Sequence, residues 1–167
     1  MKRTMVLVAM ALVLASCATP IEKWTPLPFD EAEYGALQTV GTGIVRGSVF
    51  AKTVGGDLKL GAGEFVRLYP VTKYTQQRYR ENWLAGKPAT HSEDPRYIKY
   101  VREKTVGVDG KFEFRDVPPG DYYAQSNVTW NVVRPTSLGP INESQGGLVI
   151  KRITVTNGQV TDVALAY

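Results

Sequence analysis

The sequence contains a single cysteine, Cys17, and a single histidine, His91. These residue types supply many nucleophiles, bases and metal ligands, but catalysis needs several such groups held together, and a metal ion needs several ligands at short spacing. His91 lies in a polar stretch with no second histidine or free cysteine near it, and the adjacent acids Glu93 and Asp94 alone are weak support for a calcium site. We therefore expect no catalytic residue, no metal and no other cofactor, and we interpret His91 as a solvated loop residue.

Cys17 stands at the end of an N-terminal export signal. Two basic residues precede an apolar run from Met5 to Leu14, and small residues lead directly into Cys17. A basic start, a short apolar core and a small-residue cleavage site are typical of a secretory signal, so residues 1–16 are predicted to be a cleaved signal peptide. The apolar run is too short for a transmembrane helix, which needs about 20 residues.

The sequence Leu14-Ala15-Ser16-Cys17 resembles the lipobox of bacterial lipoproteins. The resemblance implies that Cys17 becomes a lipidated N-terminus, with a diacylglycerol and, in many bacteria, one further acyl chain. Two or three chains anchor a protein stably, whereas one chain binds only marginally. Ala18 at the next position resembles the pattern that Gram-negative bacteria sort to the outer membrane. We therefore expect a lipid-anchored envelope protein, on the outer membrane and facing the periplasm.

The length of the remaining chain, 151 residues, suits one domain with a sizeable core. Removal of the signal takes away two of the 20 Lys and Arg residues, which leaves 18 against 16 Asp and Glu and lowers the formal charge from +4 to +2. This small charge, without a run of basic residues, argues against a nucleic-acid partner. Because Cys17 is the only cysteine, no disulfide can form within the domain, and packing must stabilise it.

Residues 17–42 are predicted to form a tether between the lipid and the domain. They show little periodicity and carry three prolines, Pro20, Pro26 and Pro28. A flexible chain of about 25 residues would reach roughly 25–30 Å. The segment also holds three aromatic residues, which are unusual in a linker: Trp24, Phe29 and Tyr34. Because exposed aromatic surface is costly, these residues either dock on the domain or meet a partner.

From Gly43 onward the sequence shows the period of two that is typical of β-strands. Strands are predicted over residues 43–51, 64–70, 111–117, 148–156 and 160–167. A further strand is predicted directly after the corner at Pro118-Pro119-Gly120. Glycine-containing turns separate several of them, and Gly55-Gly56 and Gly146-Gly147 are both interpreted as turns because they lack the lysine of a phosphate-binding loop. Short strands at such intervals predict a β-sandwich.

The last two predicted strands conflict with a simple hairpin. A two-residue turn at Asn157-Gly158 would set Ile153 opposite Asp162, so that a charge would share the apolar face. A shift of one residue pairs Ile153 with Val163 instead. We therefore expect a three-residue or bulged loop, or two strands that do not pair directly.

The stretch from Gly110 to Tyr122, with its G-x-F-x-F and V-P-P-G-x-Y pattern, resembles the signature of carboxypeptidase regulatory-like domains. The resemblance covers residues 43–70 and 105–167 and fails over 71–104. It implies an all-β, Greek-key sandwich of about seven strands, transthyretin-like or Ig-like, in which Phe112 and Phe114 fill the space between the sheets. In the namesake enzymes this domain carries no active site, so the resemblance implies a module that is not an enzyme.

Residues 71–104 form an insertion that the resemblance does not explain. We predict a short helix or irregular segment over residues 72–85 and a strand from about Tyr97 to Val106. Aromatic residues gather in or near the insertion and make up a candidate binding surface: Tyr74, Tyr79, Trp83, Tyr97, Tyr100 and Trp130. The alternative is that these side chains pack on one another as a second small core.

The sequence favours a non-catalytic, lipid-anchored envelope module that interacts with a protein. Two alternatives stay open. One is an accessory lipoprotein that binds carbohydrate. The other is an outer-membrane anchor of a secretion system, because the outer-membrane lipoprotein of type VI secretion also has a transthyretin-like fold. The expected partners are the membrane, through the lipid on Cys17, and an envelope protein or a glycan.

Overall fold

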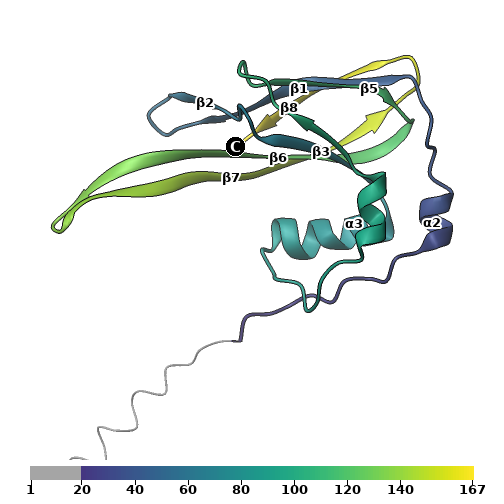
Figure 1. Cartoon of the computed structure of the whole chain (residues 1–167), viewed down its shortest axis with the longest axis horizontal. Helices are drawn as coiled ribbons and strands as arrows, with labels where there is room; N and C mark the ends of the chain where they lie inside the picture. Colours follow the sequence, from purple (N-terminus) through teal and green to yellow (C-terminus); the bar gives the residue numbers. More distant parts are fainter. Residues whose placement is uncertain (1–19) are drawn as a thin grey trace, which may run out of the picture.

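The computed structural model describes residues 20–167, which contain two four-stranded sheets packed face to face (Figure 1). The first sheet contains β1 (Gly43–Lys52), β2 (Leu58–Leu60), β5 (Lys111–Val117) and β8 (Val160–Ala166). The second has the order β4 (Arg102–Thr105), β3 (Phe65–Pro70), β6 (Gly120–Thr136) and β7 (Gly139–Val155). The predicted β-sandwich is confirmed, with eight strands rather than about seven. The predicted signal peptide and the lipidation site at Cys17 lie outside the described residues.

The chain crosses between the two sheets four times, after β2, β4, β5 and β7. In the first sheet β1 pairs antiparallel with β2 and β5 and parallel with β8. The last two strands therefore belong to different sheets and do not pair directly, which is one of the outcomes expected from the register conflict. Asp162 instead lies opposite Arg46, where the two side chains form an ion pair of 2.8 Å on the solvent face.

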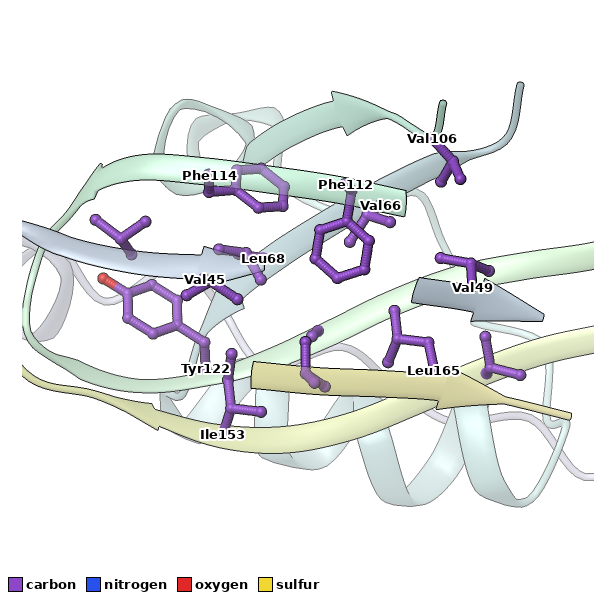
Figure 2. Close-up of a cluster of buried hydrophobic side chains, with 14 of the residues drawn as sticks. Val45, Val49, Val66, Leu68, Val106, Phe112, Phe114, Tyr122, Ile153 and Leu165 are labelled. Carbon is purple, nitrogen blue, oxygen red and sulfur yellow. The ribbon is translucent and has the colours of Figure 1, made fainter. Parts of the chain in front are cut away.

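The period-two alternation of the strands directs apolar side chains between the sheets, as Figure 2 shows. Val45 and Val49 from β1 face Val66 and Leu68 from β3, and all four side chains are fully buried. Phe112 and Phe114 are 5% and 6% exposed, and their rings meet edge to face with centroids 6.0 Å apart. At the corner after β5, the Tyr122 hydroxyl donates a hydrogen bond of 3.0 Å to the carbonyl of Pro118.

The insertion between β3 and β4 is largely helical. Helix α3 (Lys73–Arg78) begins at a capping box made by Thr72 and Thr75 and continues into the wider π-helical turn η1 (Tyr79–Leu84). The predicted strand from about Tyr97 is wrong in its first part: residues Pro95–Tyr100 form a 3₁₀ helix, η2, and β4 starts only at Arg102. Asp94 caps η2 by accepting the backbone N–H of Arg96, and Pro95 favours the first helical position.

The segment predicted as a tether is docked on the domain over much of its described length. Trp24 pairs with Ala89 in an isolated parallel bridge, and Gln77 holds the neighbouring backbone through hydrogen bonds of 3.0 Å with Leu27 and Thr25. A short helix, α2 (Glu31–Gly35), follows and buries Tyr34. Trp24 is 4% exposed and Tyr34 1%, so the structure shows the docked alternative for both rings.

In the part of the chain that the structure describes, every helix is too short or too polar to cross a membrane.

Candidate functional site

Most of the predicted aromatic surface residues pack on one another between the insertion and the outer face of the second sheet. Tyr74 lies 5.3 Å from Tyr97 between ring centroids, and Tyr100 lies 4.9 Å from Tyr34. Trp83 packs on Tyr69 of β3 at 5.1 Å. Tyr74 is only 4% exposed, and Tyr79, Trp83, Tyr97 and Tyr100 are half-buried. The structure therefore places these five residues in a second aromatic core.

An ion pair sits inside the second aromatic core. Arg78 Nη1 lies 3.1 Å from Glu93 Oε2, and its guanidinium carbon lies 4.9 Å from the ring centroid of Trp83. Tyr97 donates a hydrogen bond of 2.6 Å to Glu93 and accepts one of 3.0 Å from Arg78. Burial and the hydrogen bond to Glu93 raise the pKa of Tyr97 to about 12. Because these groups are neutralised by each other, their arrangement stabilises the insertion and offers no free acid or base.

Trp130 is the one predicted residue that lies apart from the second aromatic core. It belongs to the β6–β7 hairpin, whose strands of 17 residues each run well beyond the end of the sandwich (Figure 1). The turn between β1 and β2 projects from the same end, above the hairpin in Figure 1. Trp130 lies on the inward face of β6, where it packs against the edge of the core and also borders an open space at this end.

This space is a cleft of about 870 Å³ between the hairpin and the β1–β2 turn, which we call the hairpin cleft. Its lining includes two aromatic rings and several polar side chains: Trp130, Tyr167, Lys52, Asp57, Lys59, Asn131, Arg134 and Gln145. Tyr167 is held at the end of β8 because its backbone N–H donates to the carbonyl of Phe50 at 3.0 Å. The sequence analysis missed Tyr167, since no local pattern connects it to Trp130.

Two glycines in β7 make room for the aromatic rings of the hairpin cleft. A β-carbon on Gly146 would overlap the carbonyl oxygen of Val128 in β6 and lie 2.9 Å from Cζ3 of Trp130, and one on Gly147 would lie 2.8 Å from Cε2 of Tyr167. Gly146 also has a φ of +99°, which favours glycine. The interpretation of Gly146-Gly147 as a turn is therefore wrong. These glycines lie within a strand and let both rings rest against its backbone.

Another hollow, of about 750 Å³, covers the outer face of the first sheet. Its charged side chains are largely paired with one another or with neighbours, as in Arg46 with Asp162 and Lys111 with Asp109 at 3.6 Å. Within residues 20–167, no three His, Cys, Asp or Glu side chains come together as a metal site. His91 is exposed, with Nδ1 2.9 Å from the carbonyl oxygen of Ser92. The hairpin cleft, which has the two aromatic rings of Trp130 and Tyr167 in its lining, is the better candidate for ligand binding.

The chain is a β-sandwich with an open cleft at one end, and one solved structure shares much of its fold. The chain is 33% identical to a protein from Pseudomonas aeruginosa, PA1324, whose crystal structure is described as that of a proposed carbohydrate-binding protein. The match has a TM-score of 0.71 and covers 85% of this chain and 99% of the other. The chain belongs to the same family as this Pseudomonas protein.

Two further matches are weaker. Colossin-A of Dictyostelium discoideum is 32% identical over 63 residues, but the match covers 36% of this chain and only 1% of Colossin-A. The minor pilin GBS52 of Streptococcus agalactiae is 14% identical with a TM-score of 0.41, which is too low to support an argument. No family model matches the chain, so the resemblance to carboxypeptidase regulatory-like domains stays a prediction.

Proposed function

We propose that this protein binds carbohydrate in the hairpin cleft and does so as a non-catalytic module that is lipid-anchored in the cell envelope. The observation that carries the proposal is the pair of rings, Trp130 and Tyr167, which rest on adjacent glycines in a cleft with polar walls. The relationship to the Pseudomonas protein, itself described as a proposed carbohydrate-binding protein, supports the same function. The lipid anchor rests on the sequence around Cys17 alone.

The chemistry of the hairpin cleft suits a sugar. A pyranose ring has an apolar face of C–H groups that packs on an aromatic ring, and hydroxyl groups at its edge that need both donors and acceptors. Trp130 and Tyr167 provide aromatic surface. Gln145 lies directly opposite Trp130 in the hairpin and carries a planar amide that can donate and accept at once. The open shape of the cleft fits a chain of several sugar units better than one enclosed sugar.

The backbone of both aromatic residues is fixed before a ligand arrives, and Tyr167 is 59% exposed and thus accessible to a ligand. Trp130 lies in a strand that pairs with β7 over its whole length, and Tyr167 is tied to β1 by its backbone N–H. Rigid aromatic side chains lose little conformational entropy on binding, so affinity is gained at small cost.

The proposal is tested on the mature chain with Cys17→Ser, which removes the lipid-bearing side chain. A glycan array would identify ligands, and calorimetry would compare variants for the best of them. We expect Trp130→Ala and Tyr167→Ala each to weaken binding at least about tenfold, which corresponds to roughly 1.4 kcal/mol. Phe65→Ala is the matched control, because Phe65 is an aromatic residue of β3 that is 44% exposed and lies outside the cleft.

A protein that binds no glycan on the array would contradict the proposal, and so would unchanged affinity in both cleft variants. Gly147→Ala is an independent test variant. It removes no side chain from the cleft, but its added methyl group would displace the ring of Tyr167. It should therefore weaken binding without removing any group that contacts the sugar.

A further inference from the structure

The charged side chains of the hairpin cleft are unevenly distributed. Lys52, Lys59 and Arg134 line it, whereas Asp57 is the only acidic residue in the lining. Lys52 is exposed and forms no ion pair within the described part of the chain. The side chains that line the cleft thus carry three positive charges and one negative charge, and Glu143 beside Arg134 adds a second carboxylate.

The two other cations have acidic neighbours, but these pairs are weak. Lys59 Nζ lies 3.7 Å from Asp57 Oδ2, and the side chain of Asp57 is 75% exposed. Arg134 Nη2 lies 2.7 Å from Glu143 Oε2, with the Arg134 side chain 62% exposed. Solvent-exposed ion pairs contribute little free energy, so an incoming anion can replace or share either acidic partner.

The cations stand on both sides of the aromatic rings. Lys59 of β2 pairs with the inward-facing Ala51 on the sandwich side of the cleft, and Arg134 belongs to the distal part of the hairpin. A glycan chain that stacks on Trp130 and Tyr167 would therefore pass between positive groups from two different elements. A guanidinium such as that of Arg134 can hold an oxyanion through two parallel hydrogen bonds.

We infer that the glycan bound in the hairpin cleft is acidic, that is, a chain whose sugar units carry carboxylate or sulfate groups. This inference rests on the proposed function and specifies its ligand class. Neutral sugars would use only the rings and the amide of Gln145, whereas an acidic glycan would also compensate the cations of the cleft. The aromatic rings supply general affinity for sugar, and the cations select the charged chains.

The experiment uses an array that holds neutral, carboxylated and sulfated glycans, followed by calorimetry with three probes of equal length. These are an oligogalacturonate, its carboxyl-reduced and hence uncharged counterpart, and a sulfated galactan oligosaccharide. We expect the array to favour acidic glycans, and at least one acidic probe to bind ten times or more tightly than the uncharged one. This preference should shrink as salt concentration rises. The two acidic probes distinguish carboxylate from sulfate.

Lys59→Gln and Arg134→Gln should each reduce the affinity for the acidic probe several-fold more than the affinity for the uncharged probe. Lys151→Gln is the matched control, because Lys151 is an exposed lysine of β7 outside the cleft. Array hits dominated by neutral glycans, or equal affinity for charged and uncharged probes, would overturn the inference and leave the proposed function standing. If neither Trp130→Ala nor Tyr167→Ala changes affinity, or no glycan binds at all, the proposed function fails and the inference fails with it.

Discussion

Tyr79 stacks on Tyr123 with ring centroids 4.7 Å apart and 14° between the ring planes. Tyr79 belongs to the helical insertion and Tyr123 to the outward face of β6, so this contact fastens the insertion to the second sheet. Tyr123 is only 4% exposed as a result. The outer face of this sheet is therefore a packed interface, whereas the outer face of the first sheet is charged and meets solvent.

Replacement of residues 72–96 by a short Gly-Ser loop should therefore destabilise the domain. The change would uncover Trp24, Tyr69 and Tyr123, and the loss of buried apolar surface should cost on the order of 5 kcal/mol or prevent folding. Chemical denaturation of the purified variant would measure the loss. Trimming the exposed hairpin tip over residues 135–140 is the control and should cost less than about 1 kcal/mol. A replacement variant as stable as the natural protein would show that the insertion is dispensable for folding.

Truncation of either core phenylalanine should be costly. Phe112→Ala or Phe114→Ala should lower the free energy of unfolding by about 3–5 kcal/mol, because each ring fills space between the sheets that neighbours cannot reoccupy. Phe65→Ala should cost much less, since Phe65 is 44% exposed. Denaturant titrations of the three variants give the comparison. Losses below about 1 kcal/mol for both core variants would mean that the rings contribute little to the core.

The buried tyrosines predict a loss of stability at alkaline pH. Burial raises the pKa of six of them above the ordinary value of 10.0: Tyr34, Tyr69, Tyr74, Tyr97, Tyr122 and Tyr123. Because the folded state favours the protonated phenol, this stabilisation is complete below pH 10 and is lost as the pH rises toward the folded pKa, which for Tyr97 is about 12.

The phenolate absorbance contributed by these six tyrosines and the near-ultraviolet circular dichroism should therefore change together in one cooperative step as the pH is raised. Tyr97→Phe should lower stability at neutral pH, through the lost hydrogen bonds to Arg78 and Glu93, and should make the alkaline decline shallower. Gradual ionisation of these tyrosines near pH 10, with the dichroism intact, would contradict the burial argument.

Cys17→Ser should release the full-length protein from the membrane fraction and abolish its labelling with palmitate. The reason is that a serine cannot accept the thioether-linked lipid, and no other cysteine can replace it. Fractionation of cells after metabolic labelling measures both effects. If the natural protein takes up no palmitate and the variant still sediments with membranes, the lipoprotein prediction is wrong.

The local sequence pattern was sufficient to predict the strands of the β-sandwich and their buried faces. The alternation around Val45, Phe112 and Phe114 predicted strands and buried faces that the structure contains, because a strand places successive side chains on opposite faces whatever its neighbours are. The conflict between Ile153 and Asp162 also indicated that the last two strands need not pair. The 3₁₀ helix at Pro95–Tyr100 was missed because Tyr97, Ile98 and Tyr100 are residue types that also favour strands.

The location of the candidate site depended on tertiary structure. Local sequence could list the aromatic residues, but it could not decide that Tyr74 is buried between Trp24 and Tyr97 while Trp130 faces a cleft. It also could not bring Tyr167 to Gly147, because these residues come from different sheets and meet only when the sheets pack. The sequence alone determined which faces of the strands are apolar. Two tertiary features decided which aromatic residues are buried in a core and which line the cleft. These are the packing of the two sheets and the extra length of β6 and β7 beyond them.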